Sequence, residues 1–316
     1  MARRILTPFR ARRRIADLQN RYGRAKMDRR RFLGISGAAL ALAAIPRPTL
    51  AQQFRMYDLC VLDPAGRLTS TADMRGKLLF LHWWGAWCPP CKRELPELAW
   101  LEGEFKGRDD VRFVFMNGLE HNDRSLAFLK SANLAVSQYN SLNMSRKERN
   151  MFRTDGTEVS LDGLGIKLYP QTWIVNRTGT VVKYFAGANP NWRWWKTYVE
   201  DEAKKPWDGK FLAPAEKLGW ATGIYKADEG ERRIKIAVEP GGPEGQAKIA
   251  AQWLPPGAAP GTLKAVWATP EAITLSGNFQ SGNALRAVAT PQGLAGVYQT
   301  GTKTSLAKFE MKKTAA

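Results

Sequence analysis

Cysteine and histidine are scarce in this chain of 316 residues, which contains three cysteines and two histidines. Three cysteines are too few for a fold held together by disulfides, and they are also too few for a four-cysteine zinc site. The length is enough for about two domains. A hydrophobic content of 44% with twelve tryptophans supplies the side chains for a sizeable core. The composition therefore excludes a disulfide scaffold and indicates a globular protein.

The positive charge of the chain is unevenly distributed. The net charge is +19, and residues 1–51 contain 13 of the 48 basic and 2 of the 29 acidic residues. The remainder therefore contains 35 basic and 27 acidic residues, an excess of +8. Nucleic-acid binding requires a clustered basic footprint, which this moderately basic remainder does not predict. We expect no nucleic-acid partner.

Long apolar runs are also absent, and the run Leu33–Ile45 has only 13 residues. This is too short for a membrane span of about 20 residues. A basic cluster precedes the run and the small residue Ala51 follows it, which is the arrangement of a secretory signal. The stretch "DRRRFLG" also resembles a twin-arginine export signal, with Arg29 and Arg30 as the pair.

We therefore expect residues 1–51 to be an export signal, of twin-arginine type, and the mature protein to be periplasmic. An ordinary secretion signal and an uncleaved membrane anchor are the alternatives. Residues 1–26 are rich in arginine, so either the basic region is long or translation starts at Met27, which we slightly favour. A cysteine pair in the oxidising periplasm is either a static disulfide or a redox device supplied with electrons.

Two of the three cysteines stand two residues apart in "WGAWCPPCKRELPEL", residues 84–98. The preceding residues, 77–84, form a continuous apolar run that is typical of a strand buried on both faces. The following residues show helical spacing, with Leu95, Leu98, Leu101 and Phe105 on one face. Cys88 is therefore expected at the N-terminal end of a helix, where unpaired backbone N–H groups and the helix dipole favour a thiolate.

The spacing of this pair suits thiol–disulfide exchange. Cys91 lies one helical turn after Cys88 on the same side, so Cys88 can attack a substrate disulfide and Cys91 can resolve the mixed disulfide. Pro89 and Pro90 lack N–H donors, which should leave the thiolate less stabilised and make the pair more reducing. The alternatives are a static disulfide and a metal site, and a metal site lacks a second pair of ligands.

The order of patterns predicts an α/β fold over residues 52–207. We expect two short strands around the turn 63–66, a second buried strand at 111–117, a helix capped by Asp123 and running to about Leu134, a hairpin formed by 172–175 and 180–187, and a helix capped near Asn191. The first strands need crossover connections and are therefore parallel, whereas the hairpin is antiparallel. This is a mixed sheet flanked by helices, of thioredoxin type, with a polar insertion at 137–162.

The last third of the chain, residues 208–316, changes to a twofold hydrophobic period. Examples are "RRIKIAV" and "SLAKFEM", and clusters of proline and glycine divide this part into about eight short strands. The pattern predicts an all-β domain, a small antiparallel barrel or a sandwich, after a linker at 204–215. This domain has no cysteine or histidine, and we expect it to be a stabilising or docking appendage.

The segment "FLHWWGAWCPPCKRELPEL" resembles the active-site segment of the thioredoxin superfamily. More narrowly, it resembles the extracytoplasmic TlpA/ResA-like thiol-disulfide oxidoreductases, many of which serve cytochrome c maturation. The resemblance covers about residues 53–204 and also rests on Pro96 and "LYPQTWIVNRTGTVV". It implies that Cys88 is the nucleophile and Cys91 the resolving thiol. It also implies that Pro170 is a cis-proline facing the disulfide, and that Tyr169 lends its backbone to a bound substrate chain.

The resemblance, or the surrounding sequence, also predicts the roles of four other residues. Glu94 lies where the family often has a carboxylate, which could relay a proton to or from Cys91, although a surface glutamate is nearly as good an interpretation. Trp87 is expected to shape the rim of the active site, or else to be a core residue. His82 is expected to be a strand histidine with its hydrogen bonds satisfied. Cys60 is expected to be a buried free cysteine, with an intermolecular disulfide as the alternative.

Taken as a whole, the sequence predicts a periplasmic thiol-disulfide oxidoreductase that acts as a reductant and needs no cofactor or metal beyond the Cys88–Cys91 pair. Its expected partners are a protein disulfide as substrate and a membrane thiol carrier as the source of electrons. One alternative is an oxidant of the same fold that donates its disulfide. Another is a non-catalytic binding protein that acts through the β-rich domain.

Overall fold

The structure is a computed structural model that describes residues 58–141, 150–228, 231–301 and 306–314. The expected export signal, residues 1–51, lies outside the described residues. The chain from Leu50 onward forms one compact unit. Within the described ranges, we find no helix with both the length and the apolar character needed to cross a bilayer.

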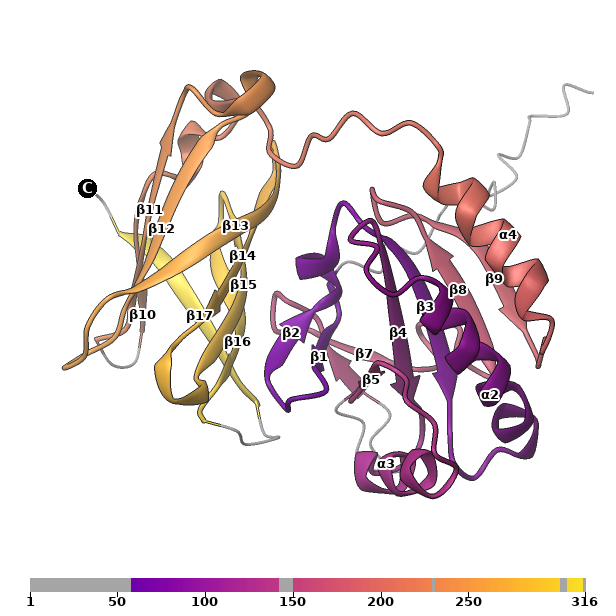
Figure 1. Ribbon diagram of the computed structural model, residues 1–316. Coiled ribbons are helices and arrows are strands. Elements are labelled where there is room, and N and C mark those ends of the chain that lie inside the picture. Colours follow the sequence, from indigo (N-terminus) through magenta and orange to yellow (C-terminus); the bar gives the residue numbers. More distant parts are fainter. Residues whose placement is uncertain (1–57, 142–149, 229–230, 302–305, 315–316) are drawn as a thin grey trace, which may run out of the picture. The chain divides into compact units, whose positions relative to one another are not determined.

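A mixed sheet of five strands forms the first half of this unit, in the order β5-β4-β3-β8-β9 (Figure 1). The central strand β3 (Leu78–Trp84) pairs in parallel with β4 (Val111–Asn117) and antiparallel with β8 (Gln171–Val175). Strand β5 (Gln138–Tyr139) extends the parallel side, and β9 (Val181–Ala186) completes the antiparallel hairpin. Every residue of β3 is buried, as a continuous apolar run predicts. The predicted mixed sheet is confirmed.

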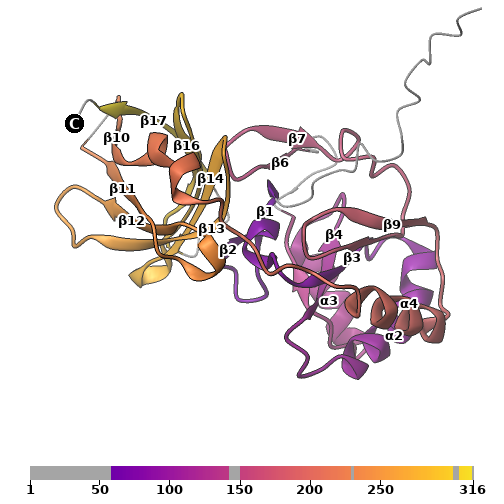
Figure 2. The same ribbon diagram turned by 90° about the horizontal axis from the view of Figure 1, so that it is seen from above.

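Helices cover one face of this sheet. Helix α2 (Pro89–Glu104) and helix α4 (Trp192–Ala203) lie side by side in both views (Figures 1 and 2). Their buried side chains, among them Leu95 and Trp195, pack with Phe80 of β3 in one hydrophobic cluster. In α4 the side chain of Asn191 accepts a hydrogen bond from the backbone N–H of Trp194 at 3.1 Å, so the cap predicted near Asn191 is confirmed.

Among the described residues, strands and a 3-10 helix cover the other face of the sheet, and no α-helix does. Successive residues of a strand point to opposite faces, so Leu79 and Leu81 of β3 face away from α2. They pack against strand β1 (Cys60–Leu62), against Met151 in the hairpin of β6 (Asn150–Phe152) and β7 (Glu158–Ser160), and against Leu161, which follows β7. The predicted insertion at 137–162 therefore contributes to the core in its described part.

Two smaller predictions concern local structure. The hairpin of β1 with β2 (Leu68–Ser70) is confirmed, and Gly66 in its turn adopts a positive φ of 76° that glycine tolerates. The helix predicted to start from a cap at Asp123 is α3 (Asn122–Ser131), whose N-cap is His121. The capping prediction is wrong because Asp123 lies inside the first turn, where a carboxylate favours the helix dipole. The helix also ends before Leu134.

The last part of the chain is a closed antiparallel barrel of eight strands, in which β10 pairs with β17 (Figure 1). The strands are β10 (Gly223–Ala227), β11 (Arg233–Glu239), β12 (Lys248–Leu254), β13 (Gly261–Thr269), β14 (Ala272–Asn278), β15 (Ala284–Thr290), β16 (Gly293–Gln299) and β17 (Leu306–Thr314). Short 3-10 helices occur at Thr71–Met74 (η3), Ala215–Lys217 (η4), Gly219–Ala221 (η5), Pro243–Gly245 (η6) and Gln280–Gly282 (η7). The all-β prediction is confirmed, and the closure decides for a barrel over a sandwich.

Strand β15 carries different side chains on its two faces. Leu285 and Ala287 pack inside the barrel. On the other face, Arg286 is only 2% exposed and donates hydrogen bonds to the Asp73 carboxylate at 2.7 Å and to the Leu68 carbonyl at 2.9 Å. A buried guanidinium requires such partners. Barrel and sheet therefore share a buried polar network through β2 and η3.

Candidate active site at the start of helix α2

The cysteine pair lies where strand β3 passes into helix α2. Cys88 is the N-cap residue, and its Sγ accepts a hydrogen bond from the backbone N–H of Cys91 at 3.3 Å. Pro89 and Pro90 are the first two residues of the helix, where the missing N–H groups leave no intrahelical bond unmade. The predicted position of Cys88 at a helix N-terminus is confirmed, and this environment favours a thiolate in the reduced protein.

The two cysteines form a disulfide, with their Cα atoms 5.3 Å apart. Cys88 is 2% exposed and Cys91 is fully buried, so Cys88 is the sulfur nearer the surface. An incoming thiol can therefore reach Cys88 before Cys91. In the part of the chain that the structure describes, no group of three or more His, Cys, Asp and Glu side chains could hold a metal ion.

Glu94 lies one helical turn after Cys91 on the same side of α2. Its side chain is fully buried, so the interpretation as a surface glutamate is wrong. One carboxylate oxygen, Oε1, accepts a hydrogen bond from the backbone N–H of Asn189 at 3.0 Å, and Oε2 has no partner among the described residues. Burial raises the pKa of Glu94 to about 7, against the opposing effect of that hydrogen bond. The carboxyl can therefore both hold and release a proton near neutral pH.

An aromatic pair lies beside the cysteines. The Tyr169–Pro170 peptide bond is cis, as the resemblance implied for Pro170. The rings of Trp87 and Tyr169 meet edge to face with centroids 5.2 Å apart, and Tyr169 packs against the cluster that contains Cys88. Trp87 is 41% exposed, and its indole N–H donates to the carbonyl of Gly118 at 3.0 Å. Trp87 is therefore a surface residue next to the site and not a core residue.

The loop after strand β4 supports this arrangement, and no sequence pattern predicts its role. A Cβ on Gly118 would lie 2.3 Å from the Tyr169 ring, so the close approach of that ring requires glycine. The Glu120 carboxylate accepts hydrogen bonds from the backbone N–H of Ala86 at 2.7 Å and from the hydroxyl of Ser125 at 2.5 Å. Glu120 thus fixes the segment between β3 and Cys88. Neither residue belongs to a motif, so only tertiary structure identifies them.

His82 lies in the middle of β3 and is fully buried. Its Nδ1 lies 2.9 Å from the hydroxyl of Thr172, two residues after Pro170, and its Nε2 has no partner among the described residues. Burial lowers the pKa of His82 to about 3, so the ring is neutral at physiological pH. The expectation of a strand histidine is confirmed, but only one of its two nitrogens is satisfied.

Cys60 is a free cysteine with no exposed surface, as expected. It packs with Leu62, Leu68, Ala284 and Val297, that is, between the β1–β2 hairpin and the barrel. Burial raises the pKa of its thiol. A buried, protonated thiol is a poor nucleophile, so the structure gives no support to an intermolecular disulfide at this position.

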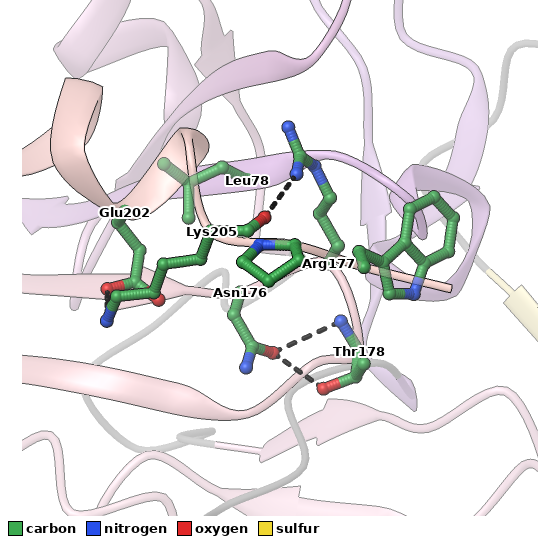
Figure 3. Close-up of a pocket in the computed structure, with 8 residues that line it drawn as sticks. Leu78, Asn176, Arg177, Thr178, Glu202 and Lys205 are labelled. Atoms are coloured by element: carbon green, nitrogen blue, oxygen red, sulfur yellow. Dashed lines mark hydrogen bonds and ion pairs between the residues drawn. The ribbon is translucent and has the colours of Figure 1, made fainter. Parts of the chain in front are cut away.

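A pocket of about 150 Å³ lies at the other end of β3 (Figure 3). Leu78, the first residue of β3, lines it together with the β8–β9 turn and the segment after α4. Arg177 donates to the carbonyl of Lys205 at 3.2 Å, and the Asn176 side chain accepts from both the backbone N–H and the hydroxyl of Thr178. These bonds hold the turn and the start of the linker in place. The pocket is remote from Cys88 in the strand direction and is not part of the candidate active site.

Known proteins match the part of the chain that contains the cysteine pair. The Redoxin family model matches residues 50–197. The chain is 32% identical over 146 residues to the thiol:disulfide interchange protein DsbE of Pseudomonas aeruginosa, covering 46% of this chain and 71% of DsbE. It is 30% identical over 125 residues to the thiol-disulfide oxidoreductase ResA of Bacillus subtilis, covering 40% of this chain and 62% of ResA. The crystal structure of StoA from Bacillus subtilis superposes with a TM-score of 0.36 and 20% identity, covering 45% of this chain and 96% of StoA.

Proposed function

Because the chain belongs to the family of thiol:disulfide interchange proteins that includes DsbE, we propose that it reduces protein disulfides outside the cytoplasm. The observation that carries the proposal is the Cys88–Cys91 disulfide at the N-terminus of α2, with Cys88 nearer the surface. Export through the twin-arginine route and residence in the periplasm are part of the proposal. They rest on the sequence of residues 27–51.

In the proposed reaction, the reduced protein acts first through Cys88. The Cys88 thiolate attacks one sulfur of the substrate disulfide, a new S–S bond forms to Cys88, and the other substrate sulfur leaves as a thiolate that takes up a proton. Cys91 then loses its proton and attacks the Cys88 sulfur, which releases the second substrate thiolate and forms the Cys88–Cys91 disulfide. Two electrons pass from the protein to the substrate.

Glu94 is proposed to accept the Cys91 proton in the second step. It lies one turn after Cys91, is buried, and has a pKa raised to about 7. A base whose pKa lies near the working pH is best suited to such a transfer. In the return step, in which a membrane thiol carrier reduces the disulfide, Glu94 would give the proton back.

Tyr169, Pro170 and Trp87 are proposed to bind the substrate chain. The resemblance to TlpA/ResA-like proteins implies that the backbone of Tyr169 pairs with an extended substrate segment through main-chain hydrogen bonds. The half-exposed ring of Trp87 gives the segment an apolar surface. Apocytochrome c, with its cysteine pair, is the proposed substrate class, because the resemblance to TlpA/ResA-like proteins implies cytochrome c maturation.

The test combines activity with a reduction potential. We expect the wild-type protein to reduce insulin disulfides in the presence of a thiol reductant, and Cys88→Ser to abolish this activity while Cys60→Ser preserves it. Full activity in Cys88→Ser would refute the proposal. A potential near about −270 mV would support a reductant, whereas a value near about −120 mV would indicate the disulfide-donating oxidant. A pair that stays oxidised until the protein unfolds would indicate a static disulfide.

Each of the three parts of the chain has its own proposed role. We propose that residues 1–51 are removed as a signal, that residues 52–207 carry the chemistry, and that residues 208–316 serve as a docked appendage. The buried bonds of Arg286 to Asp73 and Leu68 support a docked barrel rather than a loosely tethered binding module. Sequencing the N-terminus of the exported protein tests the signal and the start at Met27.

A further inference from the structure

Aromatic and cationic side chains gather on the outer side of helices α2 and α4, away from the cysteines. What we call the aromatic–cationic surface consists of Trp100, Lys183, Trp192, Arg193, Trp194 and Tyr198. Trp100 belongs to α2, Lys183 to the neighbouring strand β9, and the others to α4. Both ribbon views show α4 lying along α2 (Figures 1 and 2). The surface therefore consists of two groups, Trp100 with Trp192 and Arg193, and Lys183 with Trp194 and Tyr198.

Two of the three tryptophans of this surface are exposed, whereas Trp192 packs partly against the core. Trp100 is 47% exposed and Trp194 is 38% exposed, whereas the neighbouring Trp195 is fully buried and fills the inner face of α4. The indole N–H of Trp195 donates to the Asn189 carbonyl at 3.0 Å. In contrast, no described residue accepts a hydrogen bond from the indole N–H of Trp100 or Trp194. These two groups are left to bond with something outside the protein.

The cations of the surface are held over the rings and lack acidic partners. The Arg193 guanidinium lies 4.4 Å from the centroid of the Trp192 ring, and the Lys183 ammonium lies 5.6 Å from that of Trp194 and 5.7 Å from that of Tyr198. No carboxylate in the described ranges forms an ion pair with Lys183 or Arg193, whereas Lys196, nearer the end of α4, pairs with Glu200. Lys183 and Arg193 therefore carry positive charge that no described ion pair offsets, while Glu97 and Glu104 lie one turn from Trp100 on α2.

We propose that the aromatic–cationic surface binds the headgroup region of an anionic phospholipid bilayer. Amphipathic tryptophan and tyrosine rings, flanked by lysine and arginine, are the side chains that favour the membrane–water interface. Anionic headgroups would attract Lys183 and Arg193, and the excess of +8 on residues 52–316 acts in the same direction. A second copy of the chain is a worse occupant, because a symmetric contact would bring these like charges together.

This inference goes beyond the proposed redox function and is compatible with it. Trp100 lies twelve residues after Cys88 in the same helix, which corresponds to about 18 Å along the helix axis. A bilayer in contact with Trp100 would therefore leave the start of α2 free for a substrate protein. The surface would keep the protein at the membrane, close to the carrier that supplies its electrons.

The experiment measures sedimentation of residues 50–316 with phospholipid vesicles. This piece contains every described helix and strand, so it keeps all the hydrophobic clusters and omits the basic leader that would bind lipid by itself. Vesicles of phosphatidylcholine with phosphatidylglycerol are compared with vesicles of phosphatidylcholine alone. The variants are W100S/W194S and K183Q/R193Q. The matched control is L126S/K130Q on α3, which removes an equally exposed apolar side chain and an exposed charge elsewhere.

We expect the wild-type protein to bind the anionic vesicles and to bind the neutral vesicles weakly. W100S/W194S should lose about tenfold or more in binding through lost apolar contact. K183Q/R193Q should lose about fivefold per charge, and the control should bind like the wild type.

Several outcomes would overturn the proposal. One is that the wild type does not bind the vesicles, and another is that the control variant loses as much binding as the surface variants. A third is that the wild type is a dimer that W100S/W194S dissociates, which would mean that a second copy of the chain occupies the surface. Insulin reduction in solution should be unchanged in both surface variants. That readout separates failure of this proposal from failure of the redox proposal.

Discussion

The buried carboxyl of Glu94 should make the stability of the oxidised protein depend on pH. Burial raises its pKa from an ordinary value of 4.5 to about 7, with only the Asn189 backbone N–H opposing the shift. Below pH 4.5 the Glu94 carboxyl carries its proton in both the folded and the unfolded chain. As the pH rises toward 7, the unfolded chain ionises first, so the free energy of unfolding falls. By about pH 8 the Glu94 carboxyl is ionised in both states and the loss is complete.

The magnitude follows from the size of the shift. A shift of one pKa unit corresponds to about 1.4 kcal/mol, so Glu94 should lower the free energy of unfolding by about 3 kcal/mol between about pH 4.5 and about pH 8. Glu94→Gln has nearly the same shape and carries no titratable proton. We therefore expect this variant to lose that part of the pH dependence, whatever its absolute stability.

The assay is denaturant unfolding of the disulfide-bonded protein at about pH 5 and about pH 8. The wild-type difference between the two conditions should exceed the Glu94→Gln difference by about 2.5 kcal/mol, because the unfolded carboxyl is already partly ionised at about pH 5. Glu97→Gln is the control, because it makes the same substitution on the same helix at a partly exposed position. If wild type and Glu94→Gln show the same pH dependence of unfolding, the pKa of Glu94 is not raised by its burial. The proposed role of Glu94 as proton acceptor then fails as well.

Three further substitutions test contacts around the site and the barrel. Gly118→Ala should displace the Tyr169 ring and raise the KM for a peptide disulfide more than it changes kcat. It should also lower the free energy of unfolding by about 1–3 kcal/mol. An unchanged KM would argue against substrate binding at Tyr169. Arg286→Ala leaves Asp73 without its buried partner and should cost about 3–5 kcal/mol in denaturant unfolding, and a loss below about 1 kcal/mol would show that the network is not closed. Cys60→Ala should leave insulin reduction unchanged and remove the one thiol that reacts only after unfolding of the oxidised protein.

Local signals explain most of what the sequence could predict. The apolar run of β3 and the helical spacing after Cys91 required strand and helix in that order, which alone placed Cys88 at the N-cap. The hairpin of β8 and β9 and the Asn191 cap also depend on residues close together in the chain. At the start of α3 the capping prediction was wrong by two residues, because the N-cap His121 makes no side-chain cap hydrogen bond and so leaves no signal in the sequence.

Contacts between distant segments could not be predicted. The burial of Glu94 depends on Asn189, which is 95 residues away, and the Arg286–Asp73 pair spans 213 residues. Closure of the barrel depends on the pairing of β10 with β17, which no turn signal encodes. The pattern of alternating residues is the same in a sandwich and in a barrel, so the sequence left both open.

The site itself shows where local rules and function conflict. The Oε2 atom of Glu94 and the Nε2 atom of His82 are buried without partners among the described residues, and a buried unsatisfied group costs about 1–3 kcal/mol. Selection for stability alone would favour leucine or another apolar residue at position 94, because the surrounding cluster is apolar. A carboxyl one turn after Cys91 at this cost is better explained by proton transfer to the resolving thiol than by folding. Glu94→Gln should therefore lose two properties together, the pH dependence of unfolding and the rate of thiol–disulfide exchange, since both depend on the same buried carboxyl.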